Sequence, residues 1–164
     1  MRSFERFLTN KVAGTSIMPK KVRRIFLRIC GMKIESSSRI MSDIFFDTNN
    51  VSIGKNSFVN RFCQFHDGGY NAEIVIGNEV MIAMNVNLCA ISHDIGSAHR
   101  RAGKSYVKKI EIEDGCWIGA NVVILPGVTI SKGCVIAAGS VVNKNTEENG
   151  LYVGVPARRI KTFD

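Results

Sequence analysis

The chain has 164 residues, which suits a single folded domain, and its 45% hydrophobic and 22% charged residues exclude a disordered chain. The formal net charge of +8 fits an anionic partner, but there is no zinc-finger spacing, basic region with heptads or RNP-like aromatic motif, so nucleic acid is not expected. Five scattered cysteines without a CxxC pair indicate neither a disulfide framework nor a zinc site. With no signal-peptide pattern and no apolar run of about 18 residues, we expect a cytoplasmic protein.

Residues 1–33 are expected to form a short helical cap. Pro19 suits the first turn of a helix and Gly31 suits its end. Between them the apolar residues follow the i, i+3, i+4, i+7 pattern of an amphipathic helix, at Val22, Ile25, Phe26 and Ile29. The other positions are largely basic, and we expect the helix to cover the open end of the repeat array that follows. Peripheral contact with the inner face of a membrane, through the same basic helix, is the alternative.

Residues 34–150 carry a period of six. From residue 112 onward an aliphatic residue stands at every sixth position, at Ile112, Ile118, Ile124, Ile130, Ile136 and Val142. A small residue follows four positions after each of the first five, at Cys116, Val122, Val128, Cys134 and Ser140. Six is not a helical period, but it fits short strands joined by tight turns, with three hexads in each triangular coil. The sequence therefore predicts an all-β solenoid, with an ordinary β-sheet protein as the alternative.

The same period is fainter in the first half of the chain. It places aliphatic or aromatic residues at Ile34, Ile40, Phe46, Ile53, Val59, Phe65, Ile76, Ile82 and Leu88. Two segments interrupt it, residues 66–73 and the polar, basic residues 92–109, and we expect the second to protrude as a loop. Loops on a rigid scaffold often carry function, so both segments are candidates for a site. Residues 151–164 are expected to form a basic C-terminal tail.

The stretch from Ile76 through Ile160 resembles the hexapeptide-repeat acetyltransferases, most closely the maltose and galactoside O-acetyltransferase branch. The segments that carry the resemblance are IGNEVMIAMNVNL, the ISHD that follows, CWIGANVVILPGVTI, VIAAGSVVNK and GVPARRI, with IGKNSFVNRF as an earlier match. The resemblance implies a left-handed parallel β-helix, acetyl-CoA as the acyl donor with no metal, and a homotrimer with active sites between subunits. The handedness is implied by the resemblance alone, because crossovers between parallel strands are nearly always right-handed.

The chain contains three histidines, His66, His93 and His99. His93 follows a well-formed coil and opens the long basic segment. The resemblance implies that His93 is the general base, since the family's histidine at the matching position has that role. Such a base suits acetyl transfer, because a sugar hydroxyl is a poor nucleophile and a neutral imidazole can take its proton. A structural or simply exposed histidine is the alternative.

Three residues match family positions in the acceptor region. Asn60 and Asp67 match positions that contact the acceptor hydroxyls, which an amide and a carboxylate can bind. A turn-forming Asn and an Asp-Gly turn are the alternative roles for these two. Trp117, the only tryptophan, matches a residue that lines the groove between subunits, and a packing role at that interface is compatible with it.

The resemblance also implies a coenzyme A site. Ala120 and Ala138 match positions whose backbone meets the pantetheine arm, where small side chains leave room. The positions that bind adenosine and phosphates correspond to Asn143, Lys144, Arg158 and Lys161. Cations suit phosphates. A solvated basic tail is the alternative, and Arg159 replaces Arg158 if the register shifts by one.

These matches predict an O-acetyltransferase that acts on a hydroxyl of a sugar or glycan precursor. The short basic N-terminal region resembles acetyltransferases of bacterial surface-polysaccharide biosynthesis more than the maltose-type enzymes. The alternatives are a xenobiotic acyltransferase on the same fold, a non-catalytic β-helix assembly protein, and a γ-type carbonic anhydrase. The last would need three histidines that converge on zinc, and the spacing of His66 and His99 is wrong for that.

Overall fold

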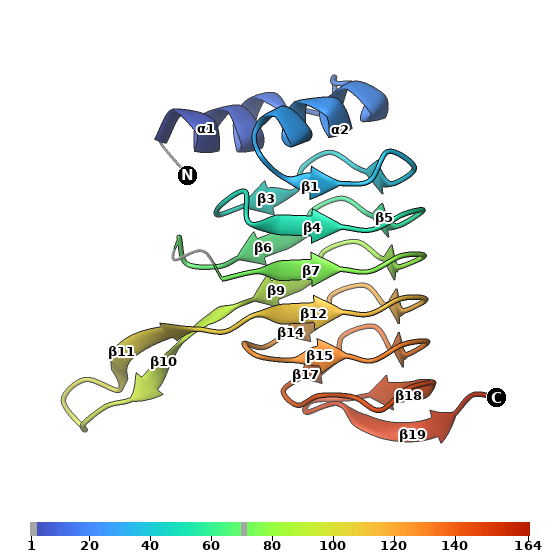
Figure 1. Ribbon diagram of the computed structural model, residues 1–164. Helices are drawn as coiled ribbons and strands as arrows, with labels where there is room; N and C mark the ends of the chain where they lie inside the picture. Colours follow the sequence, from blue (N-terminus) through green and yellow to red (C-terminus); the bar gives the residue numbers. More distant parts are fainter. Residues whose placement is uncertain (1–2, 70–71) are drawn as a thin grey trace.

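The computed structural model describes residues 3–69 and 72–164 and shows a parallel β-helix with helices across its N-terminal end (Figure 1). Successive strands pass from one sheet to the next, and equivalent strands of successive coils pair in parallel. In Figure 1 the front strands run to the right, the chain returns behind them, and each coil lies below the previous one. The β-helix is therefore left-handed, as the resemblance implies.

Three parallel sheets form the sides of the triangular solenoid. The first sheet contains β1 (Lys33–Ile34), β4 (Val51–Ile53), β7 (Ile74–Ile76), β12 (Ile110–Ile112) and β15 (Thr129–Ile130). The second contains β2 (Arg39–Ile40), β5 (Phe58–Val59), β8 (Met81–Ile82), β13 (Trp117–Ile118), β16 (Val135–Ile136), β18 (Gly150–Val153) and, antiparallel to β18, β19 (Arg158–Thr162). The third contains β3 (Phe45–Phe46), β6 (Gln64–His66), β9 (Asn87–Cys89), β14 (Val123–Ile124) and β17 (Val141–Val142).

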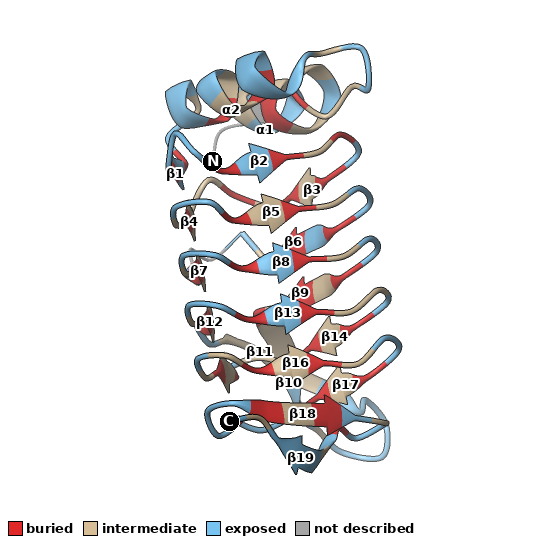
Figure 2. Cartoon of the chain, turned by 90° about the vertical axis from the view of Figure 1, so that its right-hand side faces the viewer, coloured by how far each residue is buried: buried red, intermediate tan, exposed pale blue. Residues whose placement is uncertain are grey.

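The period-six residues fill the interior of the solenoid. All six from Ile112 to Val142 are at most 2% exposed, so the predicted register is confirmed. In the third sheet the inward side chains stack in register, as Phe46, Phe65, Leu88, Ile124 and Val142. Buried and more exposed residues alternate along the short strands (Figure 2), which is the pattern of a sheet with one face in the core.

The coils turn tightly at the corner between the second and third sheets. One residue in each coil adopts a positive φ there, including Asn85 (61°), Asn121 (58°) and Gly139 (73°). Asparagine and glycine are the residue types that tolerate this conformation best. The coils also approach each other closely, because a Cβ on Gly119 would lie 2.5 Å from the backbone nitrogen of Ala138. Only glycine therefore fits at position 119 without a shift of the neighbouring backbone.

The cap consists of α1 (Ser3–Phe7), a π-helical turn, η1 (Leu8–Val12), and α2 (Lys20–Ile29). The predicted helix is confirmed in α2, which follows Pro19 and ends before Gly31, a residue with a φ of 98°. The sequence pattern did not predict α1 or η1. Among residues 3–69 and 72–164, no helix is long and apolar enough to cross a bilayer.

The packed face of α2 differs from the one that the apolar pattern predicts. Val22, Ile25 and Ile29 are exposed, whereas Arg23 and Leu27 are buried against the first coil. The Arg23 guanidinium donates hydrogen bonds to the carbonyl oxygens of Ala13 (2.6 Å), Thr15 (2.5 Å) and Met18 (2.9 Å). Because these bonds compensate its desolvation, a charged residue can share the inner face with Leu27. Phe26, the fourth residue of the predicted pattern, is partly buried and packs against the core.

Candidate active site

His93 lies on a two-stranded hairpin that leaves the solenoid between β9 and β12 (Figure 1). The hairpin consists of β10 (Ile91–Ile95) and β11 (Ala102–Val107), and His93 pairs across it with Ser105. The segment expected as a loop is thus largely an antiparallel ribbon, since Ile91 pairs with Val107 beside the core. The His93 side chain is exposed, and a strand backbone holds it more firmly than a free loop would.

The base of this hairpin touches the first interrupting segment. The backbone nitrogen of Ala90 donates a 2.7 Å hydrogen bond to the carbonyl oxygen of His66, and a Cβ on Gly68 would overlap the side chain of Ile91. These contacts join residues 66–69 to the strand that carries His93. Tyr70 and Asn71, the next two residues, lie outside the described part of the chain.

Asp67 is only 2% exposed, and both of its carboxylate oxygens accept hydrogen bonds within the chain. Its carboxylate accepts hydrogen bonds from the Thr48 hydroxyl and from the backbone nitrogen of Gly69 (3.0 Å). These bonds hold the Gly68-Gly69 turn, and they correspond to the structural alternative given above for an Asp-Gly turn. A contact between Asp67 and an acceptor hydroxyl stays a prediction.

Asp47 is a residue of this region that the sequence analysis missed. Its carboxylate accepts from the backbone nitrogen of Gly68 (3.1 Å), forms an ion pair with Arg6 (2.9 Å), and lies 3.4 Å from Nδ1 of His66. His66 also bonds to Gln64 through Nε2 at 2.8 Å. Asp47 therefore ties the cap to the turn beside the His93 hairpin, and no sequence motif marks such a contact across 41 positions.

A second group of predicted residues lies at the corner between the second and third sheets. The backbone nitrogen of Asn60 donates to Ile82 at this corner, and its side-chain oxygen accepts from the next backbone nitrogen. Ala120 and Ala138 occupy the same corner in later coils, linked through a hydrogen bond from Gly139 to the Ala120 carbonyl oxygen (2.8 Å). These positions form a column along the solenoid axis.

Trp117 stands beside this column on the outer face of the second sheet. It lies between Met81 of β8 and Val135 of β16 in the parallel register, and 58% of its surface is exposed. A large aromatic side chain so exposed on a sheet face is available for a ligand or a neighbouring subunit.

Two of the predicted coenzyme cations share a pocket at the C-terminal end. Lys144, which follows β17, and Arg158, at the start of β19, line the same pocket of about 300 Å³. Arg159 also lines it, but its guanidinium bonds to Glu147, so it is a poorer substitute for Arg158. Asn143, which precedes Lys144, and Lys161, in the same strand as Arg158, are both exposed. The Lys161 ammonium lies 5.4 Å from the centre of the Phe163 ring.

Apart from the coenzyme cations of the C-terminal pocket, the predicted site residues form two groups within one chain. Asp67 and the His93 hairpin lie where the third sheet meets the first, whereas Asn60, Ala120 and Ala138 lie where the second meets the third. The width of the third sheet separates them. A single chain does not bring the two groups together, so a site that uses both needs residues from more than one copy.

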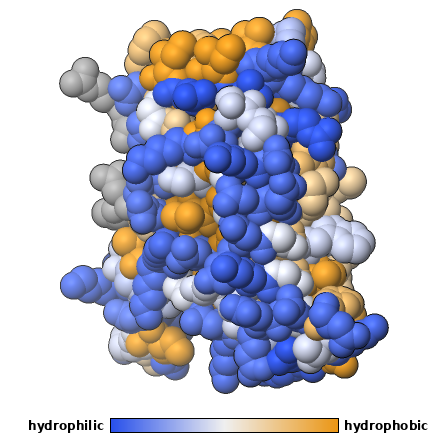
Figure 3. All heavy atoms as spheres, turned by 45° about the vertical axis from the view of Figure 1, so that its right-hand side comes forward, coloured by the Kyte–Doolittle hydropathy of each residue, from blue (hydrophilic) through white to orange (hydrophobic). Residues whose placement is uncertain are grey.

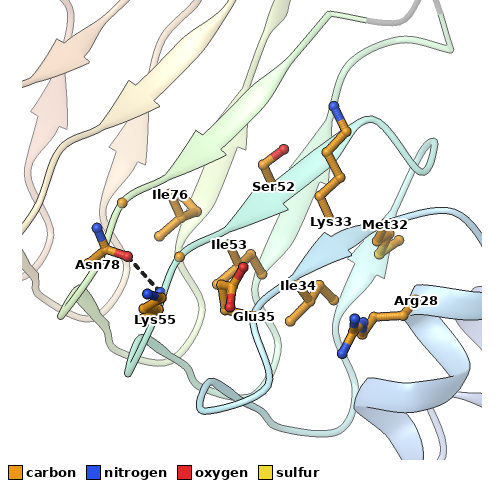
Figure 4. Close-up of a pocket in the computed structure, with 12 residues that line it drawn as sticks. Arg28, Met32, Lys33, Ile34, Glu35, Ser52, Ile53, Lys55, Ile76 and Asn78 are labelled. Atoms are coloured by element: carbon orange, nitrogen blue, oxygen red, sulfur yellow. Dashed lines mark hydrogen bonds between the residues drawn. The ribbon is translucent and has the colours of Figure 1, made fainter.

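A wide groove on the chain was not expected from the sequence. It has a volume of about 690 Å³ and lies on the first sheet beside the cap (Figure 4). Its basic residues are Arg28, Lys33 and Lys55, with Glu35 as the acidic residue, and Asn78 accepts a 2.8 Å hydrogen bond from the Lys55 backbone. It contains no histidine. Within the two described ranges, no three His, Cys, Asp or Glu side chains gather in a way that could hold a metal ion.

Comparison with known proteins gives consistent findings. Residues 109–144 match the family model described as bacterial transferase hexapeptide, six repeats. The chain is 42% identical over 152 residues to the Schizosaccharomyces pombe protein named "putative acetyltransferase", a match that covers 92% of this chain and 72% of that protein. Several Staphylococcus aureus proteins of the same name are 39% identical and are covered to 65% of their length.

Solved structures agree in fold over nearly the whole chain. A maltose O-acetyltransferase from Clostridium difficile 630 superposes with a TM-score of 0.87 and 34% identity, covering 99% of this chain and 86% of that one. A galactoside acetyltransferase in complex with coenzyme A superposes with a TM-score of 0.84 and 28% identity, covering 98% of this chain and 78% of that one.

Proposed function

Since the chain belongs to the hexapeptide-repeat acetyltransferase family, and to its maltose and galactoside O-acetyltransferase type, we propose that it moves the acetyl group of acetyl-CoA to a hydroxyl of a sugar or glycan precursor. The observation that carries the proposal is the exposed His93 on a firmly paired hairpin whose base contacts the Asp67 turn. The coenzyme A complex of a 28% identical structure supports the donor.

In the proposed reaction the neutral imidazole of His93 takes the proton of the acceptor hydroxyl. The hydroxyl oxygen attacks the thioester carbonyl, a C–O bond forms, and the C–S bond breaks as the tetrahedral intermediate collapses. The imidazolium of His93 then returns the proton to the departing sulfur of coenzyme A. No covalent enzyme intermediate is needed, and the overall change is an ester plus free coenzyme A from an alcohol plus a thioester.

The donor is proposed to lie along the column of small residues. The small side chains of Ala120 and Ala138 in this column leave room for the pantetheine arm beside the exposed Trp117. Lys144 and Arg158 line one pocket and suit the phosphates, with Asn143 and Lys161 as further contacts.

The separation of the two residue groups supports a site between subunits. A cyclic homotrimer would place the His93 hairpin of one copy against the Ala120 column of its neighbour, because a heterologous contact joins two different surfaces. The five cysteines are all free in the structure, which supports a reducing compartment such as the cytoplasm. The acceptor belongs, on this proposal, to polysaccharide biosynthesis.

The test is steady-state release of coenzyme A with a panel of sugars and glycan precursors. His93→Ala should lose about 10²- to 10⁴-fold in rate. His99→Ala is the matched control, because His99 is an exposed histidine of the same hairpin, and it should retain most activity. Near-normal activity of His93→Ala would show that His93 is not the general base. If light scattering found a fully active monomer, the proposal of an active site between subunits would be wrong.

The donor site is tested separately. Lys144→Ala with Arg158→Ala should weaken binding of coenzyme A, measured by calorimetry, and leave the thermal melt unchanged. Val155→Ala, an exposed change in the turn before β19, is the control. An unchanged dissociation constant in the double variant would show that the phosphates bind elsewhere.

A further inference from the structure

The outer face of the N-terminal cap exposes an unusual number of large apolar side chains. They are Phe4 (69% exposed), Phe7 (55%), Ile17 (90%), Val22 (49%), Ile25 (54%) and Ile29 (78%). Figure 3 shows apolar surface gathered over the end of the molecule that the helices cover in Figure 1. Single exposed apolar residues are ordinary, but a gathered set on one end marks a contact surface.

The arrangement on α2 explains how this surface is built. Leu27 and the hydrogen-bonded Arg23 anchor the helix to the first coil, so the opposite side of the helix faces outward. At 3.6 residues per turn, Ile25 and Ile29 lie on that outward side, with Val22 next to them. Three of the four residues of the predicted apolar pattern are therefore turned away from the protein, while Phe26 packs against the core.

Cations border the apolar residues. Lys20, Lys21 and Arg28 are exposed on α2, and Lys11 is exposed on the preceding turn. None of the ion pairs among residues 3–69 and 72–164 involves these four side chains. Their charges are therefore not neutralised within the described part of the chain.

The net charge of the chain is confined to this end. Residues 1–34 contain nine basic residues and one acidic residue, whereas residues 35–164 contain thirteen of each. The whole excess of +8 thus lies in the cap and its connection to the first strand, and the solenoid is neutral. A charge so localised creates an attraction for an anionic surface at one end of the molecule.

We propose that the outer face of the cap binds the surface of a lipid bilayer that contains anionic lipids. Ile17, Ile25 and Ile29 would enter the boundary between headgroups and acyl chains, and Lys20, Lys21 and Arg28 would meet the phosphates. The combination of exposed isoleucines and cations favours a bilayer over nucleic acid or a second copy of the chain. Nucleic acid would use the cations but not the isoleucines, and a second copy would place two cation-rich faces against each other. The inference does not depend on acetyl transfer.

The test is co-sedimentation of the full chain with phosphatidylcholine vesicles, with and without phosphatidylserine. We expect binding to the anionic vesicles only, and release at high salt. Lys20→Gln with Lys21→Gln should weaken binding to the anionic vesicles about 25-fold, since each surface cation raises the affinity about five-fold. Ile25→Ser with Ile29→Ser should weaken it at least about tenfold, because two apolar side chains no longer enter the boundary. Val155→Ser, an exposed apolar residue far from the cap, should bind as the unchanged chain does.

Thermal melts control for folding, which the exposed substitutions should leave unchanged. Binding of the isoleucine double variant at full strength would overturn the proposal, since the attraction would then be electrostatic alone. Failure of the unchanged chain to bind anionic vesicles would overturn it directly. So would a larger oligomer, seen by light scattering, that Ile25→Ser with Ile29→Ser dissolves, because the face would then be a contact between copies.

Discussion

Replacing Ile124 tests the packing of the solenoid most directly. Ile124 is fully buried and lies in register between Leu88 and Val142 of the neighbouring coils. Ile124→Ala removes three carbon atoms, which costs about 2.4 kcal/mol of transfer free energy at about 0.8 kcal/mol each. The coils above and below are held at about 4.8 Å by strand pairing, so the cavity cannot collapse and adds a further term. We expect about 3–5 kcal/mol in total.

The assay is urea unfolding at one fixed protein concentration, with a thermal melt beside it. A loss of this size should lower the melting temperature by about 6–20 °C, at about 2–4 °C per kcal/mol. Val123→Ala on the same strand is the matched control, because its side chain points outward and is half-buried. It should cost about 1 kcal/mol or less. Ile124→Asp, which buries an unpaired charge, should prevent folding. Equal losses for Ile124→Ala and Val123→Ala would refute the inward register.

Three further changes probe other parts of the molecule. Gly119→Ala puts a methyl group 2.5 Å from the backbone nitrogen of Ala138 and should lower the melting temperature; an unchanged melting temperature would contradict the close approach. Burial raises the pKa of the Cys116 thiol from 9.0 to about 12, so the folded chain keeps a proton that the unfolded chain releases. The free energy of unfolding should therefore fall as pH rises above 9, and less steeply in Cys116→Ala, in a pH series of urea melts. Arg23→Met leaves the buried carbonyl group of Ala13 without this donor, at about 1–3 kcal/mol, together with two partly buried carbonyl groups, and limited proteolysis should cut the cap first.

The period of six predicted the core because it has one physical cause. Each side of a coil admits one large apolar side chain, so positions such as Ile118 and Ile136 recur every six residues from Ile112 to Val142, and both are fully buried. The cap was harder to predict. An apolar stripe such as Val22, Ile25 and Ile29 normally faces the core, and only the carbonyl groups that surround Arg23 in three dimensions reverse that orientation.

The roles of the candidate site residues rest on resemblance and stay predictions, but the structure shows where the chain places them. Resemblance placed roles on Asn60 and His93, yet the chain sets them at different corners of the solenoid. Asp67 was expected to contact an acceptor hydroxyl or to hold an Asp-Gly turn, and its bond to Thr48, 19 positions away, has no local signal in the sequence. The hairpin strands around His93 were missed because their sequence is polar and lacks regular alternation.

The hairpin that carries His93 is an insertion that does not disturb the solenoid. Strand β12 resumes the parallel ladder on β7 in register, with Ile110 beside Ile74 and Ile112 beside Ile76. Because loop closure costs grow only slowly with length, this insertion can be lengthened, shortened or exchanged at little expense to the scaffold. The solenoid can therefore accept insertions of different length and sequence at this corner, so that the inserted segment can diverge independently of the stability of the scaffold.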